Sequence, residues 1–120
     1  MQKKTLVIGA SENEERYSNL AVKKLTAYNH TVVALGNKEG VINNTKIVKE
    51  NPVLTDVDTV TLYLNPINQK PYYDYIISLK PKRIIFNPGT ENEELEKLAS
   101  ANGINTMEAC TLVLLSTNQY

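Results

Sequence analysis

Short apolar runs alternate with segments of helical period along the chain. The runs 5–8, 31–35, 59–64 and 83–86 are nearly continuous rather than alternating, which is typical of strands that are covered on both faces. A fifth, weaker run covers 104–107. Each of these runs predicts a β-strand.

The segments between these strands carry helix signals. Ser18 is a typical N-cap, and Thr90 with Glu93 forms a capping-box pattern that opens a later helix. Two further helices are expected over 71–80 and 109–116. The side chains expected to face inward are Leu20, Ala21, Lys24, Leu25 and Tyr28 in the first helix, and Tyr72, Tyr73, Ile76, Ile77 and Leu79 in the 71–80 helix.

Residues 37–58 have no clear period. Val41-Ile42 and Ile47-Val48 flank Asn43-Asn44, which favours a small hairpin. Elsewhere strands and helices alternate, and right-handed crossovers between parallel strands place helices on both sides of one sheet. The sequence therefore predicts a single α/β domain over 1–120, doubly wound, with a five-stranded parallel sheet and helices on both faces.

The amino-acid composition argues against several classes of function. Lys+Arg and Asp+Glu are both 13, so the formal net charge is zero, and neither nucleic acid nor a membrane surface is an expected partner. The single cysteine, Cys110, excludes an internal disulfide framework and suits a reducing cytosol. The short apolar run before Gly9 does not predict a signal peptide, so we expect a cytoplasmic protein.

Ligands of doubly wound sheets lie outside the carboxyl ends of the strands. Four of the predicted strands end there in a glycine or an Asn-Pro pair. A single ending of this kind is explained by the residues that tight turns require. Four of them on one edge also keep side chains out of a shared crevice, which favours a ligand site there. The residues expected to bind a ligand are Gly9, Ala10, Ser11, Arg16, Tyr17, Ser18, Gly36, Asn37, Lys38, Asn65, Pro66, Asn87, Pro88 and Gly89.

The first of these turns favours an anion. Gly9 lets the backbone turn closely, and the free N–H groups of the helix that begins near Ser18 attract negative charge. Arg16 is in reach to neutralise a phosphate. The alternative is that Arg16 is a solvated charge that balances Glu12, Glu14 and Glu15. These three carboxylates would also repel a phosphate bound at an exposed site.

A nicotinamide dinucleotide is the obvious competing ligand, and it would make the protein a redox enzyme. Its usual marks are G-x-G-x-x-G and an acidic residue that ends the second strand. Here the loop reads G-A-S-E-N-E and the second strand ends Leu35-Gly36-Asn37, so both marks are missing. The phosphate-binding loop G-x-x-x-x-G-K-[ST] is also missing.

The sequence offers no catalytic group and no metal site. His30 falls at the edge opposite the crevice, and one histidine with one cysteine does not make a metal site. Cys110 is either an inert buried thiol or a functional thiol beside the crevice. Glu108 either points into the crevice or faces the last helix, and the tyrosines near 72–75 are expected to form core and interface contacts.

Five segments carry a family resemblance across the whole chain. They read VIGASENEERYSN, VVALGNKEG, VDTVTLYLNP, IIFNPGTEN and EACTLVLL. In this order and spacing the chain resembles the small stand-alone CoA-binding domain proteins, which are similar to the N-terminal CoA-binding domain of the succinyl-CoA synthetase α-subunit.

The resemblance implies a Rossmann-like domain that binds coenzyme A (CoA) at the strand ends. It implies the diphosphate over Gly9–Ser18, the adenosine near Gly36–Gly40 and the pantetheine arm past Asn65-Pro66 and Asn87-Pro88-Gly89. The synthetase's lysine at the start of the second strand is replaced by Thr31, so Arg16 or Lys38 would have to supply the charge.

The ligase chemistry of the synthetase does not carry over, because its phosphohistidine domain and nucleotide-binding subunit are not expected here. Binding of CoA or a short acyl-CoA by a non-catalytic carrier, sensor or accessory module is therefore the favoured reading. The alternatives are an NAD(P)-type redox domain and a ligand-free protein-interaction module.

Overall fold

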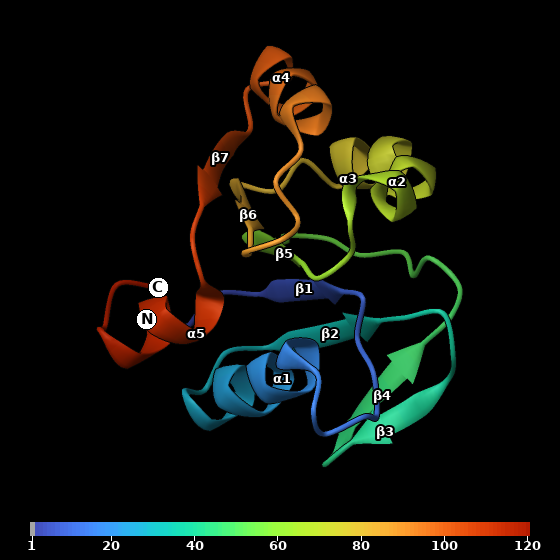
Figure 1. Cartoon of the computed structure of the whole chain (residues 1–120), viewed down its shortest axis with the longest axis vertical. Coiled ribbons are helices and arrows are strands. Elements are labelled where there is room, and N and C mark those ends of the chain that lie inside the picture. Colours follow the sequence, from blue (N-terminus) through green and yellow to red (C-terminus); the bar gives the residue numbers. More distant parts are fainter. Residues whose placement is uncertain (1) are drawn as a thin grey trace.

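The computed structural model describes residues 2–120, which form one seven-stranded sheet with helices on both faces (Figure 1). The strands are β1 (Thr5–Ile8), β2 (Val32–Leu35), β3 (Gly40–Ile42), β4 (Thr45–Val48), β5 (Thr59–Leu62), β6 (Arg83–Phe86) and β7 (Asn105–Glu108). Their order across the sheet is β3-β4-β2-β1-β5-β6-β7. Every neighbouring pair is parallel except β3 and β4.

The five predicted strands are present, but the prediction of a five-stranded, wholly parallel sheet is wrong. The hairpin expected from Asn43-Asn44 forms, and it also joins the sheet, because β4 pairs in parallel with β2. Asn43 takes the positive φ of 51° that the tight turn needs. Ile42 and Ile47 anchor the hairpin by entering the core beside Val22 and Leu25.

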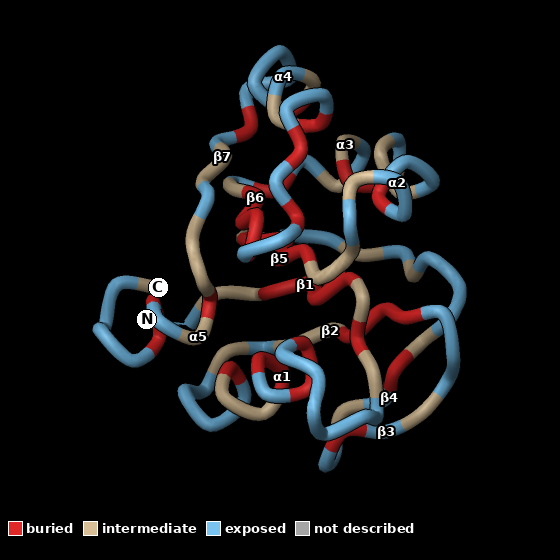
Figure 2. Tube along the Cα trace, in the orientation of Figure 1, coloured by how far each residue is buried: buried red, intermediate tan, exposed pale blue. Residues whose placement is uncertain are grey.

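The helices form a layer on each side of the sheet. They are α1 (Tyr17–Ala27), α2 (Pro66–Gln69), the short 3₁₀ helix η1 (Lys70–Tyr72), α3 (Tyr73–Leu79), α4 (Glu93–Ala101) and α5 (Thr111–Ser116). Figure 1 shows α1 and α5 on one side, and α2, α3 and α4 on the other. Buried residues follow the central strands β1, β5 and β6 between the two layers (Figure 2).

Two helix starts differ from the sequence prediction. The N-cap of α1 is Arg16, whose side chain makes no capping hydrogen bond, so Ser18 lies inside the first turn. The N-cap of α4 is Asn92, whose Oδ1 accepts from the N–H of Leu95 at 3.2 Å, while the Thr90 hydroxyl donates to the carbonyl of Asn87 instead. The capping-box prediction at Thr90 is therefore wrong.

The sequence predicted only some of the helix side chains that face the core. Leu20 in α1 and Tyr28, the C-cap of α1, were expected to face inward but are 41% and 46% exposed. Ala21, Val22 and Leu25 are the α1 side chains that meet the core. In the second helical segment Ile76 is fully buried, and the other four expected residues pack half-buried against the same core cluster.

The second helical segment also begins five residues before the predicted start at 71. Asn65 caps α2 through Oδ1, which accepts from the N–H of Asn68 at 2.9 Å, and Pro66 occupies the first helical position. Within residues 2–120, no helix has the length and apolar character that spanning a bilayer requires.

Candidate functional site

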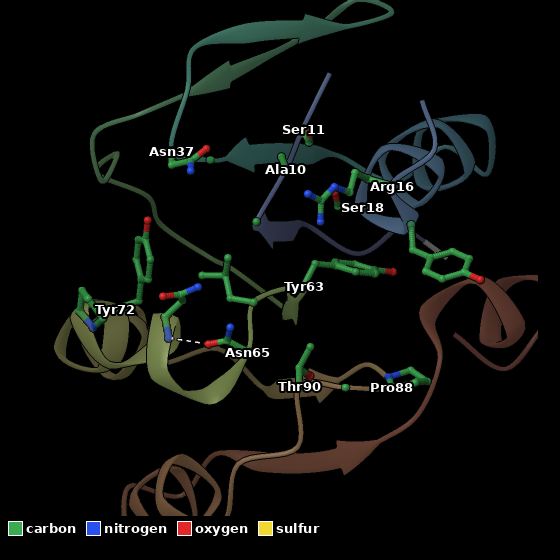
Figure 3. Close-up of a pocket in the computed structure, with 17 residues that line it drawn as sticks. Ala10, Ser11, Arg16, Ser18, Asn37, Tyr63, Asn65, Tyr72, Pro88 and Thr90 are labelled. Carbon is green, nitrogen blue, oxygen red and sulfur yellow. Dashed lines mark hydrogen bonds between the residues drawn. The ribbon is translucent and has the colours of Figure 1, made fainter. Parts of the chain in front are cut away.

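A cavity of about 690 Å³ opens at the carboxyl edge of the sheet, in the size range of small-molecule sites (Figure 3). Its walls come from the segments that follow β1, β2, β5 and β6 and from the first turn of α1. The lining residues are Gly9, Ala10, Ser11, Arg16, Tyr17, Ser18, Gly36, Asn37, Tyr63, Leu64, Asn65, Asn68, Pro71, Tyr72, Pro88, Gly89 and Thr90.

The structure brings most of the sequence-predicted site residues together in this cavity. The exceptions are Lys38, Pro66 and Asn87, which do not line it. Sequence reasoning missed Tyr63, Leu64, Asn68, Pro71, Tyr72 and Thr90. The strand-end rule would have found Tyr63 and Leu64 if the third predicted strand had been ended at Leu62, where β5 ends.

The floor of the cavity depends on two glycines that allow close backbone contacts. A β-carbon on Gly36 would lie 2.4 Å from the carbonyl oxygen of Ala10. Gly9 has a φ of +97°, and a β-carbon there would lie 3.0 Å from the backbone carbon and oxygen of Tyr63. The turn after β1 is thereby held against the ends of both neighbouring strands, β2 and β5.

Side-chain hydrogen bonds fix the loop between β1 and α1. Ser11 Oγ accepts from the N–H of Asn13 at 3.1 Å, and Asn13 Oδ1 accepts from the N–H of Glu15 at 2.9 Å. Asn19, which is 2% exposed, donates from Nδ2 to the Ser11 carbonyl at 3.0 Å. The loop is therefore shaped by the protein before any ligand arrives.

Two of the loop acids have partners of their own. Glu12 Oε2 accepts from the N–H of Val41 at 2.8 Å, and Glu14 pairs with Lys23 at 3.4 Å. Within residues 2–120 Arg16 makes no ion pair, so it is not the charge partner of these acids. It is the one charged residue of the cavity wall in this part of the chain, and Figure 3 shows its guanidinium turned toward the cavity.

Ser18 provides a hydroxyl beside Arg16. It is 3% exposed and lines the cavity. The first N–H groups of the eleven-residue α1 also lack intrahelical acceptors, and they carry partial positive charge. Arg16, Ser18 and this helix end together form a site suited to an anion.

Asn87, one of the expected ligand-binding residues, makes its side-chain hydrogen bonds inside the protein. It is 3% exposed, and its Nδ2 donates to Thr61 Oγ1 at 2.6 Å and to the Leu62 carbonyl at 2.9 Å. Its Oδ1 accepts from the N–H of Thr111 at 2.8 Å. Every polar atom of this side chain is used inside the protein, which is why it does not face the cavity.

Gln69 stabilises the opposite wall. It is fully buried, and its Nε2 donates to the carbonyls of Leu64 and Thr90 at 2.8 Å each. Its Oε1 accepts from Asn92 Nδ2 at 2.8 Å. Leu64 and Thr90, which both line the cavity, are thereby tied to one buried amide.

His30, Tyr63 and Cys110 are the side chains near the sheet that could take part in acid–base or thiol chemistry. His30 is at the opposite edge, as predicted, where its Nδ1 accepts from the N–H of Lys3 at 2.9 Å and its ring lies 4.8 Å from that of Tyr120. Burial raises the pKa of the Tyr63 hydroxyl, which lies near the side chains of Thr61 and Thr111. Cys110 is half-buried before α5 and does not line the cavity.

Within residues 2–120 the cavity wall contains no histidine, cysteine, aspartate or glutamate. Over the same residues no group of three or more such side chains is arranged to hold a metal ion. The cavity wall therefore offers hydrogen-bond donors, aromatic and apolar surface, and a single cation. It is suited to holding a long, anionic, partly apolar molecule.

Comparison with known proteins agrees with this geometry. The model of a family described as "CoA binding domain" matches residues 3–116. No curated protein matches the chain.

Solved structures share the fold over nearly the whole chain. One crystal structure of an uncharacterized protein is 51% identical, with a TM-score of 0.97, and the alignment covers 100% of this chain and 99% of that one. A hypothetical protein from Pyrococcus horikoshii OT3 is 23% identical with a TM-score of 0.86, covering 96% of this chain and 82% of that one. A conserved hypothetical protein from Pyrococcus furiosus is 23% identical with a TM-score of 0.80, covering 92% and 97%.

Proposed function

The chain belongs to this CoA-binding domain family, and we propose that it binds CoA or a short acyl-CoA in the cavity at the strand ends. In this proposal the protein is a non-catalytic carrier, sensor or accessory module, acting as a single domain. The lone cysteine suits the reducing cytoplasm as its place of action.

The observation that carries the proposal is the position of the anion site within the cavity. Arg16, Ser18 and the N-terminus of α1 supply charge and donors at one place in an otherwise uncharged wall. A diphosphate held there is stabilised by the helix end and by a charge-assisted hydrogen bond from the guanidinium.

The two ends of the ligand then follow from the cavity wall. The adenosine lies toward Gly36 and Asn37, which follow β2. The pantetheine arm, with its two amides and its apolar carbons, lies along Tyr63, Leu64 and Asn65. These residues offer amide and backbone groups beside apolar surface, which matches the mixed character of pantetheine.

A non-catalytic role is supported by the chemistry of the wall. Acyl transfer from a thioester needs a nucleophile within reach of a base. In the described chain no such pair lines the cavity, and His30 lies at the other edge of the sheet.

Thermal denaturation with added ligands tests the proposal. At a free CoA concentration about 100 times Kd, binding adds about 2.7 kcal/mol to the free energy of unfolding, which is a clear rise in Tm for a domain of this size. Acetyl-CoA is expected to act like CoA, and NAD and NADP to act much more weakly. A rise with NAD and none with CoA would instead favour the redox alternative, and no rise with any of them would favour an interaction module.

A further inference from the structure

The end of the cavity beside β2 decides how a ribose is recognised. It is formed by Gly36 and Asn37, with Ser11 on the facing loop, and none of these three residues carries a charge. In doubly wound folds a carboxylate near this strand end accepts from a free ribose hydroxyl, whereas a cation accommodates a ribose phosphate. The charges near this end therefore indicate which form of the nucleotide is preferred.

Glu12 is exposed and does not line the cavity, but it is held near this end of it. Its Oε2 accepts from the N–H of Val41 at 2.8 Å, on the strand that begins at Gly40. A β-carbon on Gly40 would lie 2.4 Å from Glu12 Cδ, so the glycine makes room for the carboxylate. The N–H of Val41 is thus already bonded to the protein's own negative charge.

The other charged side chains near this end of the cavity do not give it a net positive charge. Lys38 and Glu39 follow Asn37 in the sequence, and Lys49 and Glu50 follow β4, whose Val48 carbonyl accepts from the N–H of Gly36 at 3.0 Å. All four side chains are exposed and none lines the cavity. Lys46, which pairs with Val41 across the hairpin, is also exposed, so with Glu12 the three carboxylates and the three ammonium groups at this end balance. The charge of Arg16 lies at the proposed diphosphate position.

We infer that the site holds the adenosine of its ligand without reading the ribose 3′-phosphate, so that it takes dephospho-CoA at least as tightly as CoA. Dephospho-CoA is the same molecule without that phosphate. The preferred ligand class is then a pantetheine conjugate of a nucleoside 5′-diphosphate, with any 3′-phosphate left in solvent. This inference rests on the proposed function.

Calorimetric titration of the full chain with CoA and with dephospho-CoA tests it, at low and at moderate salt. Dephospho-CoA is expected to bind with an equal or lower Kd. The variant Glu12→Gln keeps an oxygen acceptor for Val41 and removes the charge, so it should tighten CoA relative to dephospho-CoA by about two- to fivefold at low salt, in the range of an exposed charge pair. Lys38→Met is the matched control, and it should change the ratio of the two Kd values by less than about twofold.

The failure of this inference is distinguishable from failure of the proposed function. CoA binding more than about threefold tighter than dephospho-CoA, a difference of about 0.65 kcal/mol, would overturn the inference and leave CoA binding standing. Loss of that difference in Lys38→Met or Lys49→Met would identify the cation responsible. Binding of neither ligand would overturn the proposed function and this inference together.

Discussion

The side-chain oxygen of Asn87 accepts a hydrogen bond from the backbone N–H of Thr111 at 2.8 Å, which joins the end of β6 to the start of α5. The same side chain donates to Thr61 and to the carbonyl of Leu62 on β5. Because Pro88 follows directly and lines the cavity, a residue that does not face the cavity sets the position of one of its edges.

Replacing Asn87 with alanine should therefore destabilise the fold. The change leaves the Thr111 N–H and the Leu62 carbonyl buried without these partners, at an expected cost of about 2–3 kcal/mol in the free energy of unfolding. Asn68→Ala is the control: its side chain lines the cavity but is exposed, so its effect should stay within about 0.5 kcal/mol. Equal urea midpoints for the two variants would show that water or a shift of α5 replaces the bonds of Asn87.

Comparing Gly9 with Gly103 separates the cost of a strained backbone conformation from the cost of a close backbone contact. Both have positive φ, +97° and +74°, but a β-carbon at 103 would meet nothing within 4 Å, whereas one at 9 would meet the Tyr63 backbone at 3.0 Å. Gly103→Ala should cost about 1–2 kcal/mol of stability through conformational strain alone. Gly9→Ala should cost more and should also weaken CoA binding, because Tyr63 lines the cavity.

Denaturant unfolding and CoA titration of both variants check this expectation. Equal losses of stability, with CoA binding unchanged in both variants, would mean that the Tyr63 backbone moves aside at little cost.

The sequence predicted the site's position better than its details. The continuous runs of β1, β5 and β6 and the glycine or Asn-Pro that follows each run predicted which residues meet at the sheet edge. The hairpin was expected, but its strands have only three and four residues, which is too short for a period to show that they join the sheet. Their place is set by Ile42 and Ile47 entering a core formed by distant residues.

Polar side chains were the hardest to assign from sequence. Asn87 and Ser18 are both buried residues beside predicted turns, and the sequence does not distinguish one bonded inside the protein from one open to the cavity. The α1 start was misplaced because Arg16 occupies the N-cap without a capping bond, which no propensity rule favours. Tyr63 was placed inside a strand because the apolar run continues past the last paired residue, Leu62.

Stability should fall in mild acid because of His30. Burial, with Lys3 and Arg83 nearby and Asp58 opposing them, lowers the pKa of His30 below the ordinary histidine value of about 6.5. Nδ1 must be unprotonated to accept from the Lys3 N–H. The unfolded state therefore binds this proton more readily than the folded state. The contribution is fully present above about pH 6.5 and is lost as the pH falls through the lowered pKa.

Urea midpoints measured between about pH 5 and 8 check this dependence. The variant His30→Gln should flatten the profile in that window, because it removes the group whose pKa is lowered by folding. A profile of the same steepness in the variant would assign the effect to another group.

Arg16 and Ser18 should contribute to CoA binding by different amounts. Arg16→Ala removes a cation together with its charge-assisted hydrogen bond and should weaken binding by about 1.5–3 kcal/mol. Ser18→Ala removes only a hydrogen bond from an uncharged donor to the same anion, so it should weaken binding by less. Added salt should weaken wild-type binding more than binding by Arg16→Ala. Because Arg16 is exposed and its side chain does not cap α1, its removal should leave stability nearly unchanged.

Calorimetric titration at two salt concentrations, with Lys38→Ala as a control outside the cavity, separates these contributions. If Arg16→Ala binds CoA as tightly as wild type at low salt, the diphosphate is held by backbone N–H groups or by another cation.

Incubation with acetyl-CoA should release no free CoA thiol above the buffer rate. Attack on the thioester by the Cys110 thiolate would form acyl-Cys110 and expel CoA as its thiolate, and hydrolysis would then have to restore the cysteine. Cys110 does not line the cavity, and His30, the only histidine in the sequence, lies at the opposite edge of the sheet, so no histidine base for this attack lies beside the cavity. A colorimetric thiol assay on wild type and Cys110→Ala checks this, with CoA binding by both proteins as the control for folding. Turnover by wild type that disappears in Cys110→Ala would make this cysteine a nucleophile and the protein an acyl-CoA hydrolase.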